Sequence, residues 1–132
     1  MQSRSTTNYS VPVDDELLGQ ILAAAPVDDE ERKQLHNIDF SRASFGNVAG
    51  FDRASFGDRA SFAGASFGDR ASFAGASFDA YADFAGASFG DRASFAGASF
   101  DAFASFAEAS FDAFASFAEA SFDAYGGVSP LV

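Results

Sequence analysis

The single histidine, His36, is the first residue to test for acid–base chemistry, since its ordinary pKa lies near neutrality. It falls at the end of a predicted helix, with no serine or cysteine arranged around it for nucleophilic catalysis. The many serines occupy repeat positions, the acids stand singly between repeats, and no glycine-rich phosphate loop occurs. With no cysteine in the chain, we predict no enzyme, no catalytic residue, no metal site and no cofactor.

Arginines and aromatic residues recur every 11 residues, and this pattern could bind another protein. Both residue types are enriched in binding hot spots, and an arginine can stack on an aromatic ring. A possible partner-binding stripe therefore comprises Arg59, Arg70, Tyr81, Arg92, Phe103, Phe114 and Tyr125. In the alternative, these side chains only cover the surface on which they stand.

The element that carries this stripe is an internal repeat. Sixteen triads of the form small–polar–Phe run from residues 38–40 to residues 120–122, and the spacing of their phenylalanines alternates between five and six. The true period is thus 11 residues, which is typical of a structure built by stacking. Phenylalanine makes up 18 of the 132 residues, so the same interior space must recur.

Two structures have an 11-residue period. An amphipathic α-helix completes three turns in 11 residues, and residues 101–111 suit it. Against it, nine glycines lie between residues 46 and 97, each costing about 1 kcal/mol inside a helix. In a β-coil each triad is a short strand, with its first and third residues inside and its middle residue outside. We expect the mainly β structure, with an 11-residue-repeat helix over residues 98–124 as the alternative.

The stretches IDFSRASF, from residue 38, and RASFAGASFGD resemble the pentapeptide-repeat family. The resemblance covers about residues 38–125 and implies a right-handed quadrilateral β-helix, with four repeats per turn and the central residue stacked inside. Here every second spacing is six, which enlarges a turn from 20 to 22 residues, and Ser mostly replaces the usual Asp or Asn. About four coils would then stack a core ladder that contains Phe45, Phe56, Phe67, Phe78, Phe89, Phe100, Phe111 and Phe122.

The sequence around the repeats divides into three segments. Residues 1–12 are polar and predicted to be disordered. Residues 13–37 are predicted to form a pair of short helices, separated by Pro26, which serve as an N-terminal cap of the solenoid or as a leader. Residues 126–132 form a C-terminal tail.

A net charge of −11 disfavours direct binding to nucleic acid or to anionic membranes. No apolar run is long enough to span a membrane, and the first residues lack the apolar region of a secretory signal, so we expect a cytoplasmic protein with no small-molecule substrate. The function predicted is an acidic structural or protein-interaction module that binds a protein partner or associates with itself. One alternative is a precursor, whose N-terminal leader presents multi-core repeats to a modifying enzyme. Another, which the family resemblance implies, is a DNA mimic that binds a type II topoisomerase.

Overall fold

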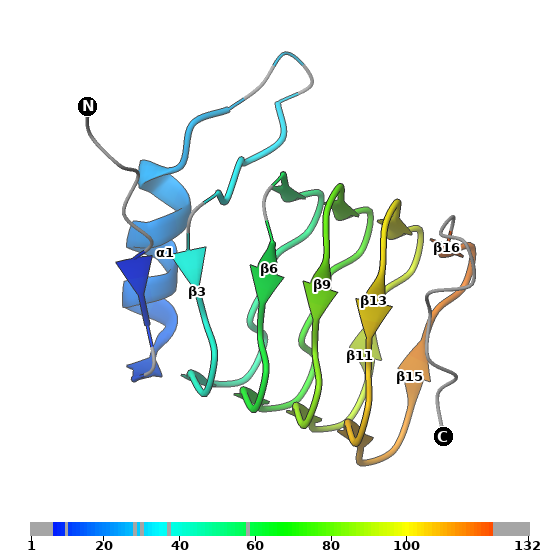
Figure 1. The fold of residues 1–132 in the computed structure, drawn as a ribbon. Coiled ribbons are helices and arrows are strands. Elements are labelled where there is room, and N and C mark those ends of the chain that lie inside the picture. The colour runs from blue at the N-terminus through cyan, green and yellow to red at the C-terminus, as the bar shows by residue number, and fades with distance from the viewer. Residues whose placement is uncertain are drawn as a thin grey trace.

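The computed structural model describes residues 7–9, 11–27, 29, 31–36, 38–57 and 59–122. These residues form a β-solenoid of about four coils with one helix, α1, at its N-terminal end (Figure 1). Each coil is 22 residues long, since strands pair in parallel with the strands 22 residues away, as Ser66 does with Ser88. The mainly β prediction is confirmed. The helical alternative over residues 98–124 is wrong, because β12 (Ser99–Phe100) to β16 (Ser121–Phe122) are strands.

The strands of the coil are two residues long and stack on four faces. The first face holds β3 (Ile38–Asp39), β6 (Ala60–Ser61), β9 (Ala82–Asp83) and β13 (Ala104–Ser105). The second face holds β4 (Ser44–Phe45), β7 (Ser66–Phe67), β10 (Ser88–Phe89) and β14 (Ser110–Phe111). The third face is made by bridges from Gly50 to Ser72 and from Ser72 to Ser94, with β11 (Ala93–Ser94) pairing β15 (Ala115–Ser116). The fourth face holds β5 (Ser55–Phe56), β8 (Ser77–Phe78), β12 and β16.

The alternation of side chains within each triad builds the core. In the triad Ala60, Ser61 and Phe62, the alanine and the phenylalanine are buried, whereas the serine is half-buried on the outer surface. This follows from the pleat of a strand, which sends successive side chains to opposite sides. The triad therefore supplies one large and one small apolar group to the interior, and one hydroxyl to the surface.

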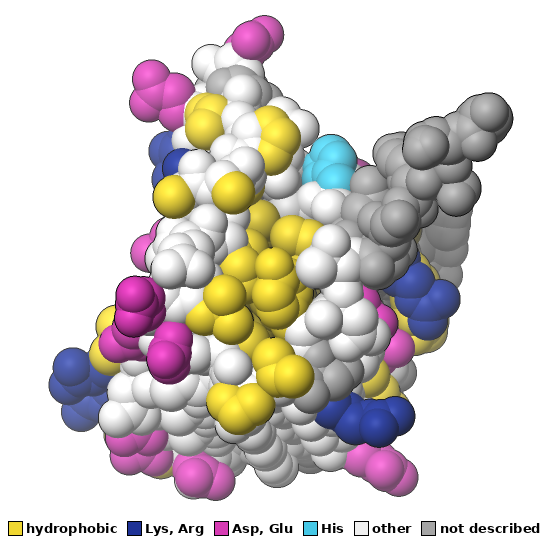
Figure 2. Space-filling view, turned by 90° about the vertical axis from the view of Figure 1, so that its left-hand side faces the viewer, with side chains coloured by type: hydrophobic (Ala, Val, Ile, Leu, Met, Phe, Trp, Pro, Cys, Tyr) yellow, Lys and Arg dark blue, Asp and Glu magenta, His cyan; other side chains and the backbone are white. Residues whose placement is uncertain are grey.

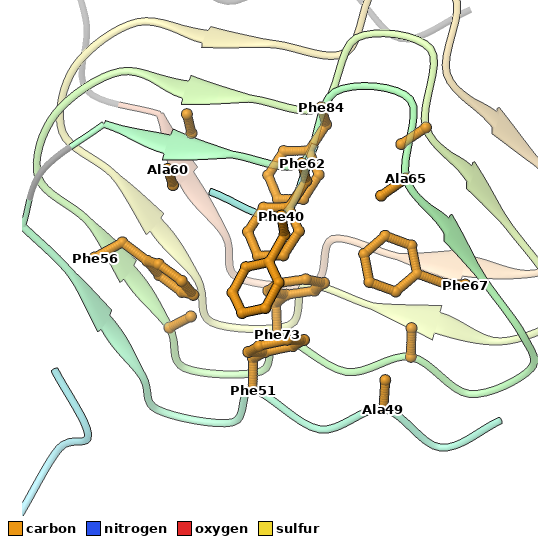
Figure 3. Packing of buried hydrophobic residues seen from close by; sticks show 14 of the residues in the cluster. Phe40, Ala49, Phe51, Phe56, Ala60, Phe62, Ala65, Phe67, Phe73 and Phe84 are labelled. Atoms are coloured by element: carbon orange, nitrogen blue, oxygen red, sulfur yellow. The ribbon is translucent and has the colours of Figure 1, made fainter. Parts of the chain in front are cut away.

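Phenylalanine rings fill the tube in four stacks (Figure 3). Phe40, Phe62 and Phe84 follow one another on the first face, and the centroids of Phe62 and Phe84 are 5.0 Å apart with the rings almost parallel. The stacking distance matches the spacing between paired strands, so the backbone sets it. Rings of different faces meet edge to face, as Phe62 and Phe73 do at 5.3 Å and 86°. Both arrangements are favourable for aromatic pairs.

Four corners join the faces, and they are of two types: two corners are two residues long and two are three residues long. Two-residue corners have their second residue in the left-handed region, and glycine fills that place in the middle coils, with φ near +70° at Gly64, Gly75, Gly86 and Gly97. Glycine adopts this conformation without a steric penalty. Three-residue corners lie at the other two edges of the tube. The alternation of five and six residues in the sequence is therefore an alternation of short and long corners.

The N-terminal segment caps the first coil by continuing its faces. β1 (Thr7–Asn8) pairs with β3, β2 (Pro12–Val13) pairs with β4, and Gln34 bridges Ser55 on the fourth face. The ring of Tyr9 stacks on Phe40 with centroids 5.6 Å apart, which extends the ladder into the cap. The prediction of disorder over residues 1–12 therefore differs from the structure at β1 and β2, because these strands find partners on the edge of the solenoid.

Helix α1 (Asp15–Ala24) is the first of the two helices predicted for residues 13–37. Asp14 caps it, since its carboxylate accepts a hydrogen bond of 2.9 Å from the Leu17 N–H, and the helix buries Leu18 and Ile21. The second predicted helix does not occur among the described residues of this segment. Lys33 and Gln34 form isolated β-bridges, and the Leu35 N–H donates to the Ser55 carbonyl oxygen at 2.9 Å. Pairing with the open edge of the first coil outweighs the helical propensity of this segment.

Arg32 also fastens the cap to the solenoid. Its guanidinium donates hydrogen bonds to the carbonyl oxygens of Arg53 and Gly75, at 3.4 and 3.1 Å. The cap is therefore joined to the second coil as well as to the first. None of the helices in the described part of the chain has the length and apolar character of a membrane span.

Candidate partner-binding columns

The predicted stripe is split into two columns on opposite corners of the solenoid. Residues 11 apart are half a coil apart, so successive members of the stripe alternate between the two long corners. The Arg59 column consists of Arg59, Tyr81 and Phe103, between the fourth and first faces. The Arg70 column consists of Val48, Arg70, Arg92 and Phe114, between the second and third faces. Tyr125 lies outside the described residues.

The Arg59 column is a stack of side chains. The guanidinium of Arg59 lies 4.8 Å from the centroid of the Tyr81 ring, and the Tyr81 ring stacks on Phe103 with centroids 5.1 Å apart. Arg59 also makes an ion pair with Asp83, with 3.9 Å between Nη2 and Oδ2. Phe103 remains 43% exposed. This column therefore covers its own corner and still presents one aromatic ring to the surface.

The Arg70 column is more open. Val48 and Phe114 are 63% and 71% exposed, although both side chains are apolar. Arg92 and Phe114 border an open hollow of about 450 Å³, which Ser94 and Ser116 help to line. Within the described residues no ion pair involves Arg70 or Arg92. These arginines are therefore available to a ligand, whereas Arg59 is already engaged.

A side-chain ladder fixes the backbone beneath the Arg70 column. Asn47 Oδ1 accepts a hydrogen bond of 2.8 Å from the Asp69 N–H, and Asp69 Oδ1 accepts one of 2.9 Å from the Asp91 N–H. Each acceptor lies over the glycine that occupies the same corner in the next coil. At Gly90, an added Cβ would lie 2.5 Å from Asp69 Oδ1 and 2.9 Å from the Gly68 carbonyl carbon. Gly68 and Gly90 are thus needed for close approach, and the ladder holds Arg70 and Arg92 in register.

A polar network lies on the outer side of the first face. Asp39 Oδ1 accepts hydrogen bonds from the Ser41 N–H and hydroxyl, at 2.9 and 2.6 Å, and the Ser41 and Ser61 hydroxyls are 2.6 Å apart. Burial acts to raise the pKa of Asp39, but the hydrogen bonds from Ser41 and Ser61 and the charge of Arg59 outweigh it and hold that pKa below its ordinary value of 3.8. This network stabilises the turn after β3.

His36 is placed against the solenoid, on the segment that was predicted to be a helix. A Cβ added to Gly57 would lie 2.7 Å from the Nε2 of His36, so the imidazole packs on this glycine. Among the described residues, no group of three His, Asp or Glu side chains is arranged to hold a metal ion.

Sequence reasoning missed the separation of the stripe into two columns, although the number of triads in a coil, once known, determines it.

Comparison with known proteins identifies the repeat. Residues 40–88 match the family model of pentapeptide repeats, in nine copies. No curated protein and no solved structure is significantly similar to the chain. The match covers a little more than two coils, and the same parallel stacking of Phe-centred triads continues beyond it to Phe122. Residues 40–88 are thus pentapeptide repeats, and the four-faced coil of the described residues is consistent with the fold of that family.

Proposed function

We propose that the chain is a non-enzymatic protein-interaction module, in which the solenoid is a rigid support for the two corner columns. One observation carries this proposal: exposed large apolar residues stand on the long corners, at Val48, Phe103 and Phe114, in columns that also contain arginines. Apolar and arginine side chains that stand together on a rigid surface are typical of interface centres. The Arg70 column is the stronger candidate, because its arginines and its hollow are open.

The alternatives receive less support. A precursor for a modifying enzyme would present accessible core segments. In this unmodified chain the repeats are packed instead, and rings such as those of Phe73 and Phe95 are at most 1% exposed. A mimic of duplex DNA would spread acids along its length. In this chain residues 38–78 have no net charge, and the acidic excess lies in residues 79–122 and in the N-terminal segment.

The test compares capture of proteins from an extract of the source organism by three tagged chains: the native chain, a Phe103→Ala/Phe114→Ala double variant, and a Val11→Ala/Val27→Ala control. The control removes exposed apolar groups of the cap, at 47% and 51% exposure, and leaves the columns intact. A partner that docks on the columns binds the native and control chains alike, and binds the double variant about tenfold more weakly. Equal capture by all three chains, with unchanged thermal unfolding, would refute the proposal.

A further inference from the structure

The two ends of the solenoid differ. At the N-terminal end, β1, β2 and Gln34 pair with the first coil, and α1 covers it (Figure 1). At the other end, β15 and β16 belong to the last coil of the described chain. Phe122 is 36% exposed there, and Phe111 and Phe117 are only partly buried, although their equivalents one coil earlier are buried. This end of the stack therefore presents an apolar centre.

Among the residues that the structure describes, none pairs with the backbone edge of the last coil. One coil earlier, the Phe95 N–H donates to the Ser116 carbonyl oxygen at 2.7 Å, and the Gly97 N–H donates to the Ala118 carbonyl oxygen at 2.8 Å. The equivalent N–H groups of Phe117 and Glu119 have no acceptor within residues 59–122 or the other described ranges. Unpaired strand edges of this kind accept strands from another chain.

Acids surround this apolar centre. The last coil, residues 101–122, has one acid at each of its four corners, Asp101, Glu108, Asp112 and Glu119, and it contains no Lys or Arg. Its net charge is −4, against zero for the coil of residues 57–78. At the equivalent corners of the first coil, Arg42 and Arg53 stand where Glu108 and Glu119 stand in the last. Among the coils, the net charge is therefore most negative at the C-terminal end.

Neither end of a second copy complements this surface. Two open ends facing each other would bring together two rims of charge −4. The capped end also has a net negative charge, since residues 1–37 have seven acids and three basic residues, although both acidic and basic side chains stand around the edge of that face (Figure 2). Like charges that face each other across an interface cost several kcal/mol. Both orientations of self-stacking are thus opposed by charge.

We infer that the C-terminal end of the solenoid is a docking surface for a protein partner that has a basic rim around an apolar centre and a free strand edge. Rings of the partner cover Phe111, Phe117 and Phe122, its strands pair with the last coil, and its Lys or Arg side chains meet the four acids. The inference extends the proposed role in protein binding to a second surface. The corner variants Phe103→Ala and Phe114→Ala leave the four acids and the rings of Phe111, Phe117 and Phe122 unchanged, so the two proposals can fail separately.

The repeat itself provides a probe of defined chemistry. A basic-rim chain carries Glu108→Lys, Asp112→Lys and Glu119→Lys, so that its end keeps the apolar centre and the strand edge with the opposite charge. Arg42 and Arg53 already occupy the equivalent short corners at φ of 61° and 62°, so a long basic side chain is compatible with this backbone. A control chain carries Asp29→Lys, Asp52→Lys and Asp79→Lys, the same change of charge away from the end.

Sedimentation equilibrium of the chains, alone and mixed in pairs, tests the inference. We expect the native and basic-rim chains to be monomers alone and to form a 1:1 complex when mixed. Its affinity should fall about tenfold between roughly 0.05 M and 0.5 M salt. The mixture of native and control chains should stay monomeric.

Four results would overturn the inference. If the native chain alone dimerises as tightly as the mixture, the occupant is a second copy. Complex formation with the control chain would show general charge attraction. If the complex forms only after residues 126–132 are removed, the chain's own tail occupies the end. A mixture that stays monomeric in every case shows that this surface does not dock a basic-rimmed end.

Discussion

Phe67 and Phe89, 22 residues apart in the chain, lie one directly above the other, with parallel rings and centroids 4.7 Å apart. The strands that carry them, β7 and β10, are paired in register. The ring separation therefore equals the spacing of hydrogen-bonded strands, and each ring has its place because the backbone beneath it repeats. Stability and surface pattern both follow from this relationship, because every buried or exposed position recurs once per coil.

The first prediction concerns the ladder. Phe84 is fully buried between Phe62 and Phe106, so Phe84→Ala removes contacts on both sides and leaves a cavity. We expect it to lower the free energy of unfolding by about 3–5 kcal/mol, measured by urea denaturation. Phe103→Ala, at an exposed corner, should cost less than about 1.5 kcal/mol. Equal losses for the two variants would contradict the ladder.

The second prediction concerns the glycines of the long corners. Gly90→Ala would place a Cβ 2.5 Å from Asp69 Oδ1, so the corner must shift, and we expect a loss of about 1–3 kcal/mol in the same assay. Gly46 occupies the equivalent position of the same corner two coils earlier, and a Cβ there meets nothing within 4 Å. Gly46→Ala should change stability by about 0.5 kcal/mol or less. A larger loss at Gly46 than at Gly90 would show that the corners are packed differently.

The third prediction concerns pH. Because the folded-state pKa of Asp39 is depressed, its carboxylate contributes stability above its ordinary pKa of 3.8, and this contribution is lost as the pH falls through the lower folded value. Asp39→Asn should cost about 1 kcal/mol at pH 7, and the difference from the native chain should shrink below about pH 4. Asp52→Asn, at an exposed corner, serves as the control. A cost at Asp39 that grows on acidification would have the wrong sign.

The fourth prediction concerns the stack at the Arg59 column. Arg59→Ala and Tyr81→Ala, combined in a double-mutant cycle, should give a coupling energy of about 0.5–1 kcal/mol, since the guanidinium lies over the ring. Asp83 also contacts Arg59, so Asp83→Ala is measured alongside to separate the ion pair from the ring contact. A coupling of zero between Arg59 and Tyr81 would mean that the two side chains do not stack in solution.

Much of the fold could be predicted because the triads repeat. The inward positions of Ala and Phe, the outward serines and the glycines at the corners all follow from alternation along a strand and from the left-handed turn at residues such as Gly64. The number of triads in a coil does not follow from the 11-residue period, because a coil of two triads would have the same period as a coil of four. That number came from the resemblance to the pentapeptide-repeat family, and the strand pairing confirms it.

The cap and the columns were harder to predict for a physical reason. Residues 31–36 have acids and bases ordered as in a helix, but the unpaired edge of the first coil offers Gln34 and Leu35 a better set of hydrogen bonds. The sequence of residues 31–36 alone carries no information about that edge, because the first coil supplies it. The stripe was treated as one surface although the 22-residue turn that the family resemblance implies already places Arg59 and Arg70 half a coil apart.

Cysteine crosslinking tests the central claim most directly, and the chain has no cysteine of its own to interfere. Ser66 and Ser88 are register partners on the exposed second face, whereas Ser77 lies between them in sequence and on the fourth face. With the shortest bifunctional thiol reagents, Ser66→Cys/Ser88→Cys should crosslink within one molecule and Ser66→Cys/Ser77→Cys should not, as peptide mapping would show. If the pair 11 residues apart crosslinks and the pair 22 apart does not, the 22-residue coil, its ring ladder and both corner columns are contradicted.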